Sequence, residues 1–114
     1  MQETLKRLRK SREGSIEVGK FKFIYKRPTE NDFYRLFITN ATPFNICCEF
    51  ITGWENVLDM DIAPNGSDEA AEFSQDLLTE WFADNSKFWK PCNDAIIGDY
   101  ERYVASKEEA EKNS

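Results

Sequence analysis

The sequence predicts an α+β fold in which an N-terminal β-hairpin packs on about four α-helices, with most residues helical. Alternating apolar residues near the N-terminus are typical of two short strands. Apolar residues at helical spacing follow through the rest of the chain, and good N-cap residues precede several of these segments. One α+β domain is expected at residues 15–106, between a basic arm at 1–14 and a charged tail at 107–114.

The N-terminal quarter of the chain contains the arm and the hairpin. In the arm, Leu5 and Leu8 share one helical face among basic residues, and two leucines bury too little surface to hold a helix alone. We therefore expect the arm to be flexible, or helical against another surface. At residues 15–28, Gly19 and the residue after it separate two alternating runs, which predicts a two-residue hairpin turn. Pro28 should end the second strand because proline cannot donate to a ladder.

Capping residues mark the next two helices. Thr29 should cap a helix that ends near Asn40. Thr42, followed by Pro43 at the first helical position, should start another helix, which Gly53 would end. The apolar faces of these two helices are expected at Phe33, Leu36, Phe37, Phe44, Cys47, Cys48 and Ile51.

The second half of the chain reads as a connection and two helices. Residues 54–72 are acidic and rich in turn residues, which predicts a long connection whose first half is held to the core. Ser74 should cap a helix that ends before residues 84–86, and the last helix should run from about Lys87 to Glu111. Their apolar faces are expected at Leu77, Leu78, Trp81, Phe82, Cys92, Ile96 and Tyr100.

Composition favours a small cytoplasmic protein. The chain has 114 residues, 40% hydrophobic and 14% aromatic, which suits one domain with a modest core and argues against disorder. No stretch reaches the roughly 18 apolar residues of a membrane span. The basic N-terminus lacks the apolar region of a signal peptide, and the three cysteines suggest reduced thiols.

Charge is distributed unevenly along the chain. The net charge of −6 combines +6 over residues 1–27 with −12 over residues 28–114. The acidic body should repel nucleic acid. The basic arm is either a solvated terminus or a segment that docks on an acidic surface, including that of another copy, so a homo-oligomer is one candidate assembly.

The sequence lacks the usual elements of catalysis and cofactor binding. It contains no histidine, which removes the commonest general base and a common zinc ligand. The five glycines form no phosphate-binding loop, and the cysteines have no metal-binding spacing. Residues 61–72 match a calcium loop only in part, because Ala63 stands at a ligand position. We therefore predict no cofactor, no metal site and no enzymatic activity.

Aromatic residues are the candidates for partner binding. In a small protein such residues form either the core or an exposed platform for other proteins. The predicted partner contacts are Phe44, Trp54, Trp81, Phe82 and Trp89. The second hairpin strand, with Phe21, Phe23 and Tyr25, is a candidate edge for self-association.

The order of several short motifs resembles the small tail assembly chaperones of long-tailed bacteriophages. These motifs are Phe-Lys-Phe at 21–23, Arg-Pro-Thr at 27–29, Gly-Trp-Glu-Asn-Val at 53–57, Asn-Gly at 65–66, Phe-Ser at 73–74 and the helix end at 111–114. The resemblance implies a non-enzymatic protein of the bacterial host cytoplasm. It also implies binding to the tape-measure protein and to tail-tube subunits during tail assembly.

Two other functions are compatible with the sequence. The first is a structural virion component, such as a head–tail connector or minor tail protein, which would be present in purified virions whereas a chaperone would be absent. A small acidic inhibitor of a host nucleic-acid enzyme would share the acidic body, but the clustered aromatic residues and the basic arm argue against it.

Overall fold

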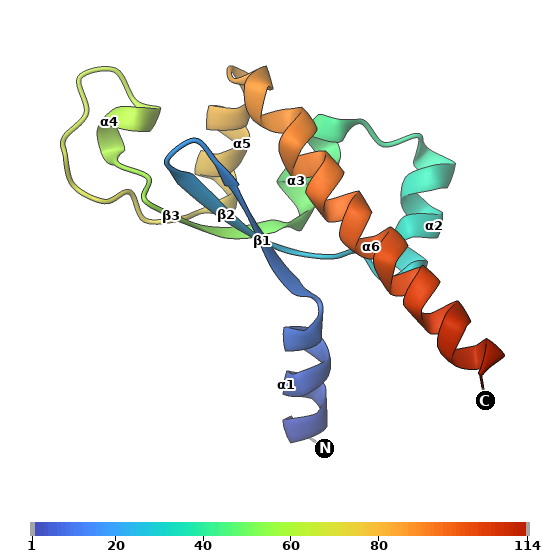
Figure 1. The fold of residues 1–114 in the computed structure, drawn as a ribbon. Coiled ribbons are helices and arrows are strands. Elements are labelled where there is room, and N and C mark those ends of the chain that lie inside the picture. Colours follow the sequence, from blue (N-terminus) through green and yellow to red (C-terminus); the bar gives the residue numbers. More distant parts are fainter. Residues whose placement is uncertain (1, 114) are drawn as a thin grey trace.

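The computed structural model describes residues 2–113 and confirms the predicted α+β class (Figure 1). A three-stranded antiparallel sheet is combined with six helices, and 61% of the described chain is helical. The strands are β1 (Glu13–Val18), β2 (Phe21–Lys26) and β3 (Ile51–Glu55). The helices are α1 (Gln2–Ser11), α2 (Glu30–Thr39), α3 (Pro43–Phe50), α4 (Asp59–Ile62), α5 (Gln75–Ala83) and α6 (Trp89–Lys112), with a short 3-10 turn η1 (Ser86–Phe88) before α6.

The predicted arm and hairpin are present, with the arm helical. Helix α1 has no buried residue and extends away from the rest of the molecule (Figure 1). Strand β1 begins at Glu13, slightly earlier than expected. It pairs with β2 along its whole length, with Glu13 opposite Lys26 at one end and Val18 opposite Phe21 at the other. Gly19 has a φ of 62°, in the left-handed region that glycine enters without steric cost.

The strand β3 was not predicted from the sequence. Helix α3 ends at Phe50, so the prediction that it continues to Gly53 is wrong. Residues 51–55 instead pair antiparallel with β2, which places β2 at the centre of the sheet in the order β1-β2-β3.

This topology also corrects the expected self-association edge. Phe21, Phe23 and Tyr25 lie on β2, whose two sides are both hydrogen-bonded to neighbouring strands. A strand paired on both sides has no free backbone groups for a further strand.

The predicted helix starts are confirmed by their cap geometry. The Thr29 side chain accepts from the backbone of Asp32, whose carboxylate accepts from the backbone N–H of Thr29 in a complete capping box. Thr42 and Ser74 each accept a hydrogen bond from the third residue of their helices.

Helix α6 ends at Lys112, close to the predicted end near Glu111, and residues 107–113 are exposed as expected. Lys107 Nζ lies 2.8 Å from Glu30 Oε2 at the start of α2. The exposed C-terminal turns of α6 are therefore tied to α2 by an ion pair.

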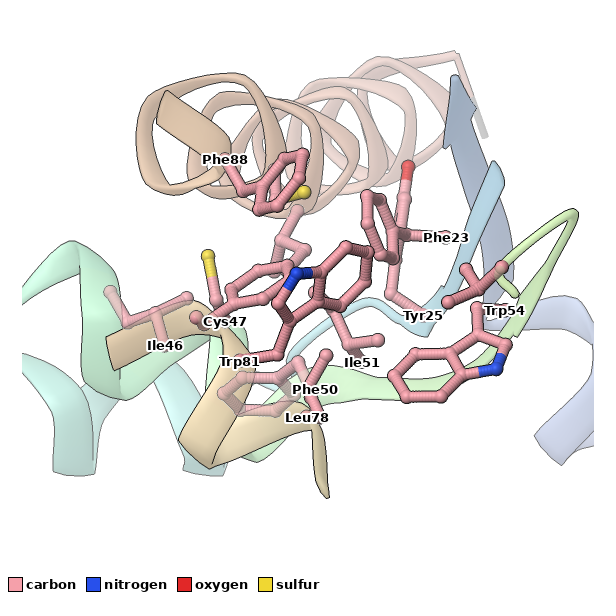
Figure 2. Close-up of a cluster of buried hydrophobic side chains, with 14 of the residues drawn as sticks. Phe23, Tyr25, Ile46, Cys47, Phe50, Ile51, Trp54, Leu78, Trp81 and Phe88 are labelled. Atoms are coloured by element: carbon pink, nitrogen blue, oxygen red, sulfur yellow. The ribbon is translucent and has the colours of Figure 1, made fainter. Parts of the chain in front are cut away.

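Aromatic rings fill the core between the sheet, α5 and α6 (Figure 2). The ring of Phe23 on β2 lies 5.9 Å from Trp81, 5.3 Å from Phe82 and 5.5 Å from Phe88, measured between ring centroids. The contacts with Phe82 and Phe88 are edge-to-face and the contact with Trp81 is tilted, and such pairs stabilise the core beyond the burial of apolar area alone.

Cys47 and Cys92 lie in the core, and Cys48 lies at its boundary. A hydrogen bond with Cys92 and burial raise the pKa of the Cys47 thiol, and burial raises the pKa of Cys48. Both thiols therefore stay protonated at neutral pH, whereas the thiolate is the reactive form.

Candidate partner-binding surface

Helix α2 carries three large apolar side chains that point into solvent. Tyr34, Phe37 and Ile38 are 68%, 80% and 62% exposed, and we call these three residues the α2 face. Their spacing of three and four residues places them on one side of the helix. Contiguous exposed apolar residues of this size are uncommon on soluble proteins and mark interaction sites.

The opposite side of α2 holds the helix on the molecule. Leu36 is buried, and the ring of Phe33 stacks on Tyr100 of α6 with centroids 4.3 Å apart. The helix is thus apolar on two sides, of which only one is covered. Sequence periodicity placed Phe37 on the inward face with Phe33 and Leu36, and this placement is wrong because Phe37 projects outward.

Ion pairs to two neighbouring helices hold the start and the middle of α2. Glu30 at its start pairs with Lys107, whose hydrogen bond and charge hold the pKa of Glu30 below its usual value. Arg35 in its middle pairs with both carboxylate oxygens of Glu49 on α3. At its end, the left-handed Asn40 donates its backbone N–H to carbonyls of the last turn. The α2 face is therefore presented by an anchored helix.

A hollow of about 400 Å³ adjoins the α2 face, between α2, α3 and α6. Its walls are mainly apolar and are formed by Phe33, Leu36, Phe37, Asn40, Ala41, Ile46 and Ile97. We call this hollow the α2 groove. Phe37 belongs to both the face and the groove, so a ligand seated in the groove also contacts the exposed ring.

A second, smaller hollow brings together two of the residues predicted as partner contacts. Phe44 and Trp89 have ring centroids 5.2 Å apart and line a space of about 310 Å³ with Pro43 and Ala83. The Trp89 indole N–H donates to the carbonyl of Phe82 at 2.7 Å, which fixes the ring. Both side chains are half-buried, so their role as partner contacts stays a prediction.

The other three predicted contacts lie in the core, which corrects their assignment to a surface. Trp54, Trp81 and Phe82 are 9%, 5% and 0% exposed. The indole N–H of Trp54 is also satisfied internally, by the carbonyl of Ala71 at 2.8 Å. A partner cannot reach Trp81 or Phe82 without opening the core.

Tyr34, Phe37 and Ile38 were missed as contact residues by reasoning from the sequence. One signal in the sequence could have found them. The helix carries a second group of apolar residues at helical spacing, and a single neighbouring helix cannot cover both apolar sides.

Other kinds of site find little support in the described residues. Within 2–113, no three His, Cys, Asp or Glu side chains gather closely enough to hold a metal ion. None of the helices in that range combines the length and apolarity needed to cross a membrane. Comparison with protein-family models, with curated proteins and with solved structures found no match to this chain.

Proposed function

We propose that the protein acts by binding other proteins rather than by catalysis, through the α2 face and the α2 groove. The observation that carries this proposal is the exposure of Phe37, which is 80% accessible on a helix fixed by a capping box and two ion pairs. Exposing such a ring is unfavourable for an isolated protein, and burial against a partner would recover about 1.5–3 kcal/mol.

The shape of the surface favours a helical partner segment. A groove between helices, flanked by apolar side chains three and four residues apart, suits an amphipathic helix that inserts its apolar face. The half-buried pair Phe44 and Trp89 lies beyond the connection that follows α2, and would extend the contact toward α5.

The motif resemblance to phage tail assembly chaperones supplies the expected identity of the partner. We propose that the bound segments belong to the tape-measure protein, and that tail-tube subunits are recruited to the same complex. Assembly in the host cytoplasm, without incorporation into the virion, is part of the same proposal.

Calorimetric titration with a helical tape-measure segment from the same genome tests this function. Phe37→Asp places a charge on the α2 face and should weaken binding at least about tenfold, as expected for a contact of central importance. Met60→Asp is the matched control, because Met60 is also exposed but lies on α4. Equal affinity of wild type and Phe37→Asp would contradict the proposal, provided that both variants keep the wild-type thermal midpoint.

A further inference from the structure

A third hollow, of quite different character, opens between α1, the start of the hairpin and the C-terminal half of α6. It measures about 600 Å³, and three arginines, Arg12, Arg27 and Arg102, contribute to its lining. Leu8 of α1 and Tyr103 of α6 add apolar surface. We call this space the arginine hollow.

Arg12 and Arg27 are neighbours across the open end of the hairpin. The backbone N–H of Arg27 donates to the carbonyl of Arg12 at 2.7 Å, so two positive side chains start from directly opposite backbone positions. Like charges in such positions destabilise a strand pair. Among residues 2–113, no ion pair joins either arginine to a carboxylate, although Glu13 also lines the hollow.

One guanidinium donor in this region lacks a partner. The Nε of Arg12 is buried from solvent and makes no hydrogen bond. A buried donor without an acceptor is unfavourable by about 1–3 kcal/mol and is uncommon in native structures. An anionic group bound at the accessible part of the Arg12 side chain would offset the repulsion between Arg12 and Arg27.

The other two arginines are held in place by internal contacts. The Arg27 guanidinium lies 3.6 Å from the centroid of the Tyr103 ring and donates to the Pro28 carbonyl at 2.9 Å. Arg102 pairs with one oxygen of Asp99, and the other oxygen accepts a hydrogen bond from Tyr25. Both oxygens of Asp99 are engaged in this way, and the carboxylate forms no ion pair with Arg12 or Arg27.

We propose that the arginine hollow binds the carboxylates of an acidic polypeptide segment from a partner protein. Guanidinium groups match carboxylates with two parallel hydrogen bonds. Leu8 and Tyr103 favour a segment that carries an apolar side chain beside its acidic ones. Extended nucleic acid fits less well than a short acidic segment, because it would also run along residues 28–114, whose net charge is −12. This site goes beyond the proposed function and does not depend on the α2 groove.

Titration with a short synthetic peptide of repeated Glu-Glu-Leu tests the inference, with a Gln-Gln-Leu peptide as the uncharged control. Arg12→Gln should weaken binding of the acidic peptide about tenfold or more, the loss expected for one hydrogen bond to a charged group. Lys10→Gln removes the same charge from an exposed position outside the hollow, and should change the affinity less than about twofold. The thermal midpoint of each variant checks that it is folded.

Several results would overturn this assignment. Equal weakening by Lys10→Gln and Arg12→Gln would indicate general electrostatic attraction. Inorganic phosphate that binds as tightly as the acidic peptide would indicate a simple anion site. A dimer of the free protein that Arg12→Gln dissociates, measured by light scattering, would assign the hollow to a second copy. Phe37→Asp should bind the acidic peptide normally, so failure here is distinguishable from failure of the α2 proposal.

Discussion

Two aromatic clusters of this molecule have opposite environments. Around α5 and η1, Trp81, Phe82 and Phe88 are 5%, 0% and 2% exposed, and their rings contact one another and the sheet. On the outer side of α2, Tyr34 and Phe37 are 68% and 80% exposed.

The difference arises from position in the fold and not from residue type. Helix α5 lies between α3, η1 and the sheet, so its apolar face is covered by several elements (Figure 2). Helix α2 lies at the margin of the molecule, beside α6, and has neighbours on one side only (Figure 1). We therefore propose that the exposed apolar side of α2 is an interface, whereas similar residue types in α5 belong to the core.

The largest expected effect is on the free energy of unfolding, which should respond to a substitution in the buried cluster but not to one on the α2 face. Phe82→Ala should lower the free energy of unfolding by about 3–5 kcal/mol, because it removes a fully buried ring and leaves a cavity. Phe37→Ala should change it by no more than about 0.5 kcal/mol, since the ring is largely in solvent. Urea denaturation monitored by circular dichroism measures both. Similar losses in the two variants would mean that the α2 face is part of the core.

A second prediction tests how tightly the core is packed at the contact between β1 and α6. A Cβ atom at Gly14 would lie 2.7 Å from the Tyr25 ring and 2.7 Å from Asp99 Oδ2, so Gly14→Ala should cost about 1–3 kcal/mol. Gly53→Ala is the matched strand control, because its nearest neighbour, Ile24, is 3.6 Å away. The same denaturation experiment compares them, and equal stability of the two variants would contradict the tight packing.

A third prediction concerns the anchoring of α2. With little buried surface, this helix depends on its capping box, so Thr29→Ala should cost about 1 kcal/mol. Amide hydrogen exchange should be faster in α2 than in α5, and the Thr29→Ala substitution should increase the exchange rate of α2 further. Thr39→Ala makes the same chemical change at the other end of α2, where the side chain caps no N-terminal amide. Unchanged exchange in Thr29→Ala would show that packing alone holds α2.

The smallest expected effect is a loss of stability at alkaline pH, which depends on Tyr25 in the core. Burial and the hydrogen bond to Asp99 raise the pKa of Tyr25 above its ordinary value of 10.0. Its contribution to stability is therefore complete below pH 10 and is lost as the pH rises through the higher pKa of the folded state. Tyr25→Phe should flatten the fall of the thermal midpoint above pH 10, while Tyr34→Phe on the α2 face should leave it unchanged. Identical profiles for both variants would contradict this assignment.

The sequence predicted the features that depend on local chemistry. Thr29, Thr42 and Ser74 cap helices where expected, and Gly19 forms the hairpin turn, because each acts within a few residues of itself. Strand β3 was missed because a strand at 51–55 exists only through its pairing with β2, far away in the chain.

The candidate surface was predicted only in part, for a related reason. Periodicity shows that α2 is apolar on two sides, but only the tertiary arrangement decides that Phe37 faces solvent. Trp81 was expected at an interface and lies in the core, because aromatic content alone does not distinguish the two. The arginine hollow joins Arg12 and Arg27 to Arg102, which no local pattern connects.

Hydrogen exchange of the free protein and of its complex with a helical tape-measure segment tests the central claim most directly. The account predicts slower amide exchange at residues 34–41, which carry the α2 face and border the α2 groove, with little change in α5. A stable complex in which exchange at 34–41 stays the same, and slows elsewhere, would show that partners bind at a different surface.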